Sequence, residues 1–234
     1  MIRLFKTILI VIVCYNVSAQ DVAQWRGPNR NGIYNETGLL KKWSDSGPKM
    51  IWHFDELGEG HTSAAVTNTA AYTSGMINGT GYVFAFDLKG NLKWKKEYGP
   101  EWTENHYGVR STPLVIKDKL YFMSSFGKLF CMNSSNGQVI WTIDTFKEYG
   151  GRNISWGVTE NLLYDGNILY CSPGGPDASV IAVDRNSGKL IWKSKGPDEK
   201  SAYCSPINVQ LATRKLLITR MDRSIQGYDA ATGL

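Results

Sequence analysis

The amino-acid sequence predicts an all-β protein, a β-propeller made of four-stranded antiparallel blades. The composition indicates a globular chain with many tight turns, because 42% of the residues are hydrophobic and glycine occurs 24 times among 234 residues. Tryptophan recurs along the chain at intervals of 42, 47 and 51 residues, at Trp52, Trp94, Trp141 and Trp192. Repeats of about this length are typical of propellers in which each repeat forms one blade.

A short motif accompanies three of these tryptophans and begins a fourth time near residue 234. It contains an aspartate or asparagine, then a glycine, then a tryptophan four residues after the glycine. Its residues are Asp87, Gly90 and Trp94; Asn133, Gly137 and Trp141; Asp184, Gly188 and Trp192; and Asp229 and Gly233. The first side chain can start a tight turn by bonding backbone amides, and glycine supplies a positive φ. We therefore expect a turn, followed by an outer strand whose tryptophan packs between neighbouring blades.

The residues before each motif complete the blade. Short apolar runs at 120–122, 168–170 and 216–218 have strand length and follow turn residues. Each repeat therefore predicts strand, turn, strand, loop, strand, motif turn and tryptophan-bearing strand. Small residues share one repeat position, where a tightly packed interior is expected: Ala85, Cys131, Ala182 and Gly227. Cys131 is accordingly expected to be a core residue rather than a reactive thiol.

The chain divides into three predicted regions. Residues 1–19 read as a secretory signal peptide, because Arg3 and Lys6 precede an apolar run that ends in the small-residue signal at 17–19. Residues 20–48 form an N-terminal leader segment. Residues 49–234 hold about four repeats, the last of them truncated, so we expect an incomplete ring in this chain. The mature protein is expected to be periplasmic or secreted and to contain no membrane span.

Charge and cysteine content exclude some classes of function. The formal net charge is +5, and it falls to +3 once the two basic residues of the signal peptide are removed. This charge is weak and dispersed, so no nucleic-acid partner is predicted. Cys131, Cys171 and Cys204 form an odd set in an exported protein, which leaves at least one thiol unpaired and the pairing open.

The motif, with its preceding small residue, resembles the tryptophan-docking repeat of the quinoproteins that use pyrroloquinoline quinone (PQQ). The same repeat occurs in the propeller component of the bacterial outer-membrane assembly machinery, which binds partners and not PQQ. The opening segment at 25–32, with Trp43 after it, resembles the leader of exported PQQ-like repeat proteins. The resemblance covers nearly all of residues 25–234, and it implies a bacterial envelope location.

The resemblance also implies where a ligand would sit, at one mouth of the central channel. Among the loops expected there, Arg110, Trp156, Glu160 and Asn161 could hold PQQ, with Glu160 and Asn161 as ligands of a calcium ion. Three of these residues have a structural alternative. Arg110 could bridge neighbouring loops, Trp156 could pack between blades, and Glu160 could be a solvated loop charge.

Two functions from different classes follow. The first is a binding or interaction scaffold in the cell envelope, whose partner is an envelope protein or a small molecule at the propeller mouth. The alternative is a PQQ-dependent alcohol or sugar dehydrogenase, in which the cofactor would carry the chemistry. The sequence contains no adjacent pair of cysteines and no aspartate in a catalytic motif, so no catalytic residue is assigned. A structural module of a larger exported protein is a third option.

Overall fold

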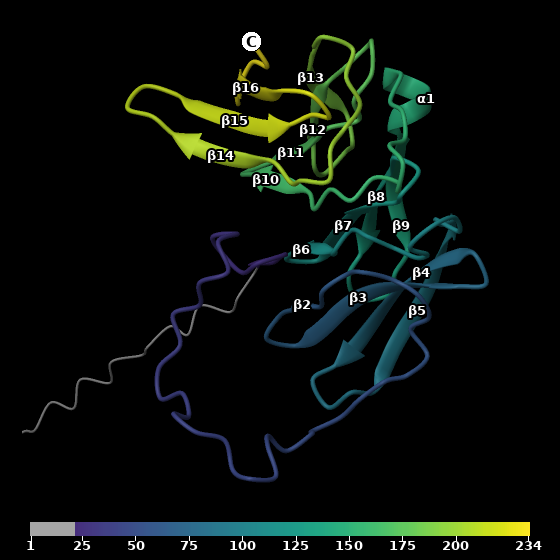
Figure 1. The fold of residues 1–234 in the computed structure, drawn as a ribbon, viewed down its shortest axis with the longest axis vertical. Helices are drawn as coiled ribbons and strands as arrows, with labels where there is room; N and C mark the ends of the chain where they lie inside the picture. Colours follow the sequence, from purple (N-terminus) through teal and green to yellow (C-terminus); the bar gives the residue numbers. More distant parts are fainter. Residues whose placement is uncertain (1–21) are drawn as a thin grey trace, which may run out of the picture.

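Residues 22–234 are described by the computed structural model, and they form four antiparallel sheets that follow one another along the chain (Figure 1). Blade 1 contains β2 (Ala65–Val66), β3 (Ala70–Ile77), β4 (Thr80–Asp87) and β5 (Leu92–Pro100). Blade 2 contains β6 (Leu114–Ile116), β7 (Lys119–Met123), β8 (Lys128–Asn133) and β9 (Val139–Asp144). Blade 3 contains β10 (Leu163–Asp165), β11 (Ile168–Cys171), β12 (Val180–Asp184) and β13 (Leu190–Ser194). Blade 4 contains β14 (Ile207–Gln210), β15 (Lys215–Arg220) and β16 (Ile225–Asp229).

This arrangement confirms the predicted β-propeller with four-stranded antiparallel blades. In each blade every strand pairs with the next one in the sequence, and the blades lie along an arc in Figure 1. Within residues 22–234, no strand pairing joins blade 4 to blade 1. The predicted signal peptide at residues 1–19 lies outside the described residues.

Tryptophans join each blade to the next. The indole N–H of Trp94 donates to the carbonyl of Ser134 at 3.0 Å, and that of Trp141 donates to the carbonyl of Arg185 at 3.2 Å. Trp52 and Trp192 make the same bond to Leu88 and Ala230, both at 3.2 Å. Each acceptor is the residue directly after the Asp or Asn of the next motif, so each of these four tryptophans docks on the motif turn that follows it in the chain.

The glycine of the motif is required for this docking. Gly188 has a φ of +72°, a region that side chains resist, and a Cβ placed there would lie 2.9 Å from the ring of Trp141. At Gly137 the same atom would lie 2.8 Å from the ring of Trp94. The indole therefore occupies the space that a side chain would need.

The first residue of the motif shapes the turn as predicted. Asp184 accepts hydrogen bonds from the backbone N–H groups of Asn186 and Ser187, at 3.1 and 2.8 Å. These bonds, with one from the Ser187 hydroxyl as the largest cause, lower the pKa of the Asp184 carboxyl below its usual value. Asn133 accepts the equivalent bond from the N–H of Ser135 at 2.9 Å, so the amide serves the turn as well as a carboxylate does.

Small residues lie opposite the docked tryptophans. Ala85 pairs with Trp94, Cys131 with Trp141, and Ala182 with Trp192 across neighbouring strands, and all three small residues are fully buried. This confirms that Cys131 is a core residue. Gly227 is exposed instead, because no strand among the described residues pairs with the free side of β16.

Apolar clusters fill the spaces between successive blades. The largest joins blades 2 and 3, where Tyr121 and Cys131 pack with Leu169 and Ile181. A second cluster joins blades 1 and 2 around Phe122, and a third joins blades 3 and 4. Cys131, Cys171 and Cys204 are all free thiols. The sequence required this of at least one of them, because their number is odd.

Two elements were not predicted from the sequence. The leader contributes β1 (Val22–Ala23), which pairs with β6 and adds a fifth strand to the inner edge of blade 2. A short helix, α1 (Thr145–Tyr149), follows β9; Asp144 caps its N-terminus by accepting from the Lys147 N–H at 3.1 Å, and Gly150 ends it with a φ of +67°.

Replacing Gly188 with alanine tests the docking directly. Gly188→Ala should lower the free energy of unfolding by about 1 kcal/mol for the positive φ and by a further 1–3 kcal/mol or so for the clash with Trp141. Gly166→Ala is the matched control, because Gly166 has a φ of +56° and no atom near its would-be Cβ. Urea unfolding of both variants measures the difference, and equal losses would contradict the docking role.

Candidate functional site

The residues that precede the innermost strands form a second chain of blade-to-blade bonds. The N–H of Ser63 donates to the hydroxyl of Thr112 at 3.0 Å, and the N–H of Thr112 donates to Oδ1 of Asn161 at 2.8 Å. The N–H of Asn161 then donates to the hydroxyl of Ser205 at 3.0 Å. One polar side chain at this position in each blade therefore binds the preceding blade, and Asn161 is the member contributed by blade 3.

Glu160 is turned into the protein and away from the mouth. Its side chain is fully buried, and both carboxyl oxygens accept from the backbone N–H of Ser172, at 3.2 and 3.0 Å. Burial raises the pKa of Glu160 to about 8, against the opposing effect of the Ser172 bonds and of the nearby Arg30 guanidinium. Glu160 is thus not a solvated loop charge but an interior group that is mostly protonated at neutral pH.

Two further buried carboxylates join blades, and the sequence analysis missed them. Glu101 follows β5 and accepts from the N–H of Ser125 in blade 2 at 3.1 Å. Glu199 follows β13 and accepts from the N–H of Arg223 in blade 4 at 3.0 Å. Each carboxylate precedes its amide by 24 residues. The signal that would have found them is a glycine and a proline shortly before each glutamate, at Gly99–Pro100 and 196–197.

Arg110 bridges the loop in which it lies. Its guanidinium donates to the carbonyls of Asn105 and His106 and lies 6.0 Å from the ring centre of Trp102. Trp102 is itself buried and bonds the carbonyl of Asn105 through its indole N–H at 3.0 Å. Arg110 therefore holds the shape of the 105–110 loop, and its hydrogen bonds lie within that loop rather than between neighbouring loops.

Trp156 is the one residue of the predicted set that remains open to solvent at the mouth. Its ring stacks on Tyr203 with a centroid distance of 5.2 Å, and His106 meets it edge-on at 5.6 Å. The hydroxyl of Tyr203 accepts from the backbone N–H of Trp156 at 2.9 Å, which fixes the pair. Trp156 and Tyr203 are nevertheless 42% and 45% exposed. Blades 2, 3 and 4 thus jointly present an uncovered aromatic cluster, defined here as His106, Trp156 and Tyr203.

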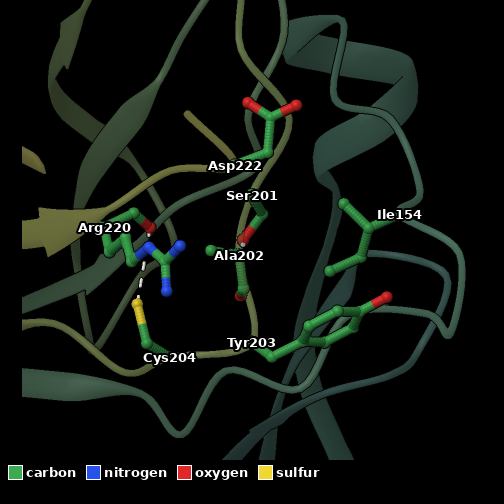
Figure 2. Close-up of a pocket in the computed structure, with 7 residues that line it drawn as sticks. All are labelled: Ile154, Ser201, Ala202, Tyr203, Cys204, Arg220 and Asp222. Atoms are coloured by element: carbon green, nitrogen blue, oxygen red, sulfur yellow. Dashed lines mark hydrogen bonds between the residues drawn. The ribbon is translucent and has the colours of Figure 1, made fainter. Parts of the chain in front are cut away.

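A pocket of about 240 Å³ lies beside this cluster (Figure 2). It is lined by Ile154, Ser201, Ala202, Tyr203, Cys204, Arg220 and Asp222. Figure 2 shows Ile154 and Tyr203 on one side, with Cys204 and Arg220 on the other. The thiol of Cys204 donates to the carbonyl of Arg220 at 3.4 Å, and burial raises its pKa, so it stays protonated. The pocket offers an apolar wall, a cation and an anion.

The four predicted residues do not form one open site for a calcium ion and PQQ. The carboxyl oxygens of Glu160 are buried in the interior, and the side-chain oxygen of Asn161 already accepts a hydrogen bond from the N–H of Thr112. Only Trp156 offers a free flat surface. Within residues 22–234, no group of three or more histidine, cysteine, aspartate and glutamate side chains is placed to hold a metal ion.

The buried carboxyl makes stability depend on pH. The pKa of Glu160 is raised on folding, so the folded state holds a proton that the unfolded state has lost between about pH 4.5 and 8. Stability from this group is therefore full below pH 4.5 and declines, by an order of 4 kcal/mol, as pH rises to 8. Glu160→Gln should flatten this decline in thermal melts recorded from pH 5 to 8. Glu104→Gln, on an exposed loop, is the control that should leave the decline unchanged.

Comparison with known proteins agrees with this architecture. Residues 33–161 match the family described as outer membrane protein assembly factor BamB. The BamB of Kangiella koreensis is 29% identical over 140 residues, which cover 58% of this chain and 32% of that protein. The quinoprotein alcohol dehydrogenase PedH of Pseudomonas putida is 24% identical over 132 residues, which cover 54% of this chain and 22% of that protein. The chain thus spans a third or less of the length of these relatives.

Among solved structures, BamB from Moraxella catarrhalis superposes with a TM-score of 0.52. It is 15% identical, and the match covers 73% of this chain and 48% of that one, so it shows a shared fold alone. The family match covers more than half of the sequence, and the docking tryptophans, motif turns and blades are those expected of the repeat. The chain therefore belongs to the PQQ-like repeat family of β-propellers, the family described as outer membrane protein assembly factor BamB.

Proposed function

We propose that this chain is an exported β-propeller that acts as a binding scaffold in the cell envelope, with a partner protein docking on the aromatic cluster at the channel mouth. The observation that carries the proposal is the contrast within the mouth. Asn161 joins two blades and Glu160 is bonded within blade 3, so neither side chain is open to a cofactor, whereas Trp156 and Tyr203 are joined by a hydrogen bond and are exposed.

The chemistry of the cluster suits protein recognition. Tryptophan and tyrosine dominate the energetics of protein interfaces because they bury a large area at little cost in side-chain entropy. The stacked pair is already ordered by the Trp156–Tyr203 bond, so docking costs less conformational freedom. The adjacent pocket adds Arg220 and Asp222 as charged groups at the rim of the same face.

The relatives support an envelope partner. One group of relatives is named for outer-membrane protein assembly and another for quinoprotein alcohol oxidation. The burial of the Glu160 carboxyl, which leaves it unavailable to a cofactor, favours the assembly proteins as the model for the function of this chain. No helix among residues 22–234 is long and apolar enough to cross a membrane. Export itself rests on the predicted signal peptide at residues 1–19.

Cofactor addition separates the scaffold from the dehydrogenase. A ligand that binds only the folded state must raise its melting temperature. We expect PQQ with calcium chloride to leave the melting temperature of the full chain unchanged. A dose-dependent rise in melting temperature would favour the dehydrogenase if Trp156→Ala abolishes it and Trp43→Ala does not. Trp43 is the control because it is an exposed tryptophan in the leader, away from the mouth.

Site-specific crosslinking tests the docking face. The photoreactive amino acid benzoylphenylalanine is placed at Tyr107, which is 53% exposed beside the aromatic cluster, and at Tyr34 in the leader, which is 56% exposed. In cells that make the protein, position 107 should give one discrete adduct and position 34 should not. Trp156→Ala should reduce the adduct about tenfold, because an anchoring aromatic side chain at an interface contributes about 1–2 kcal/mol or more. Equal adducts at both positions would contradict a docking face at the mouth.

A further inference from the structure

A second surface lies along the wall of the channel, on the first strands of blades 3 and 4. β10 and β14 each stand at the edge of their sheets, and no strand among residues 22–234 pairs with their outer side. In blade 2 the equivalent strand, β6, is covered by β1, with Val22 opposite Ile116 and Ala23 opposite Val115. The protein itself therefore shows that this inner edge accepts an extended segment in antiparallel pairing.

The free edges present backbone groups in matching positions. A two-residue turn joins β10 to β11, with Asp165 and Ile168 as the pair next to the turn. Because hydrogen-bonded residues alternate along an antiparallel ladder, the N–H and C=O of Tyr164 point to the free edge. In β14 the N–H of Leu211 bonds the carbonyl of Arg214, and counting back along the ladder from this bond shows that the N–H and C=O of Asn208 also point to the free edge. Tyr164 and Asn208 are the repeat equivalents of Val115, which pairs with β1.

A pocket of about 570 Å³ joins these two edges. Its lining includes Arg30 of the leader, Tyr164 and Asp165 of β10, and Ile207 and Asn208 of β14. Two of its residues carry buried polar atoms without a partner among the described residues, Nε of Arg30 and Oδ1 of Asn208. One is a donor and the other an acceptor. The residues around the pocket therefore retain hydrogen-bonding capacity that the described residues do not use.

The leader fixes the opposite wall of this pocket. Arg30 donates to the carbonyl of Leu162 at 2.7 Å and to that of Asn161 at 2.9 Å, so the leader loop is tied to the start of β10. The leader occupies the edge of blade 2 and then leaves the edges of blades 3 and 4 open. The charged side chain of Asp165 is already paired with Lys215, and Ile207 exposes an apolar side chain at the rim.

We propose that the edges of β10 and β14 bind an extended segment of a partner polypeptide through backbone hydrogen bonds, in the way that β1 binds β6. Such strand addition takes its affinity from main-chain bonds and its selectivity from alternate side chains. The apolar rim and the paired charge fit an uncharged segment with an apolar residue facing Ile207. The site is separate from the pocket in Figure 2 and shares no lining residue with it.

The probe is a fluorescein-labelled peptide of alternating threonine and valine with a lysine at each end, titrated against the full chain by anisotropy. A peptide of the same sequence with alternate backbone nitrogens methylated is the matched control, because it cannot complete the ladder. We expect saturable binding of the first peptide and about tenfold weaker binding of the second. In the unmodified protein, the peptide should slow hydrogen exchange at the amides of Tyr164 and Asn208.

Two proline variants sharpen the test. Asn208→Pro removes a donor from the free edge but none from the β14–β15 ladder, a position where proline is tolerated. It should weaken peptide binding about tenfold. Val66→Pro makes the same change at the equivalent edge of blade 1, outside the pocket, and should leave the affinity unchanged. If Asn208→Pro fails to fold, the exchange pattern of the unmodified protein decides.

Three results would overturn the proposal. The first is equal binding of the methylated peptide, and the second is protection confined to the mouth around Trp156. The third is protection of Tyr164 and Asn208 before any peptide is added, which would assign the edges to a segment of this same chain. Because the docking face at the mouth is tested by crosslinking at Tyr107, either proposal can fail without the other.

Discussion

The fold depends on one repeated contact, in which the indole of one blade docks on the motif turn of the next. The ring covers the glycine of that turn, and its N–H bonds the carbonyl one residue after the Asp or Asn. The hydrogen bond itself contributes about 1 kcal/mol, whereas burial of a tryptophan ring contributes several times more. Packing therefore supplies most of the stabilisation, and the bond fixes the orientation in which that packing is possible.

Hydrogen bonds between blades also run along the inner side, and they donate in both directions. Thr112, Asn161 and Ser205 each accept an amide N–H from the preceding blade, while Glu101 and Glu199 each accept one from the following blade. Together they bring the loops of three blades to one mouth. The aromatic cluster combines side chains from these three loops, with His106 and Tyr203 both packing on Trp156.

The sequence allowed the blades, the motif turns and the docking tryptophans to be predicted because each has a local signature. The aspartate, glycine and tryptophan act within a few residues of one another or at a fixed repeat distance. Cys131 could be placed in the core for the same reason. Trp156 could be placed at the mouth by resemblance, but its stacking on Tyr203, 47 residues away, has no local signature.

The roles of Asn161 and Glu160 could not be read in this way. Their side-chain types suit a calcium ion, and only the direction in which the backbone turns them decides between a calcium ligand and a structural bond, which joins two blades at Asn161 and lies within blade 3 at Glu160. The strand at Val22–Ala23 was missed because two residues are too few to show alternation, and its partner lies more than 90 residues further along the chain. Contacts between distant segments set all of these features.

The helix α1 shows where this architecture can change length. It lies between the tryptophan-bearing strand of one blade and the first strand of the next, and it interrupts neither the indole contacts nor the amide contacts. Residues can therefore be gained or lost at such junctions while the register of the whole arc is preserved. Divergence in this lineage should accordingly concentrate in the connecting loops, so that new recognition surfaces can arise on an unchanged frame.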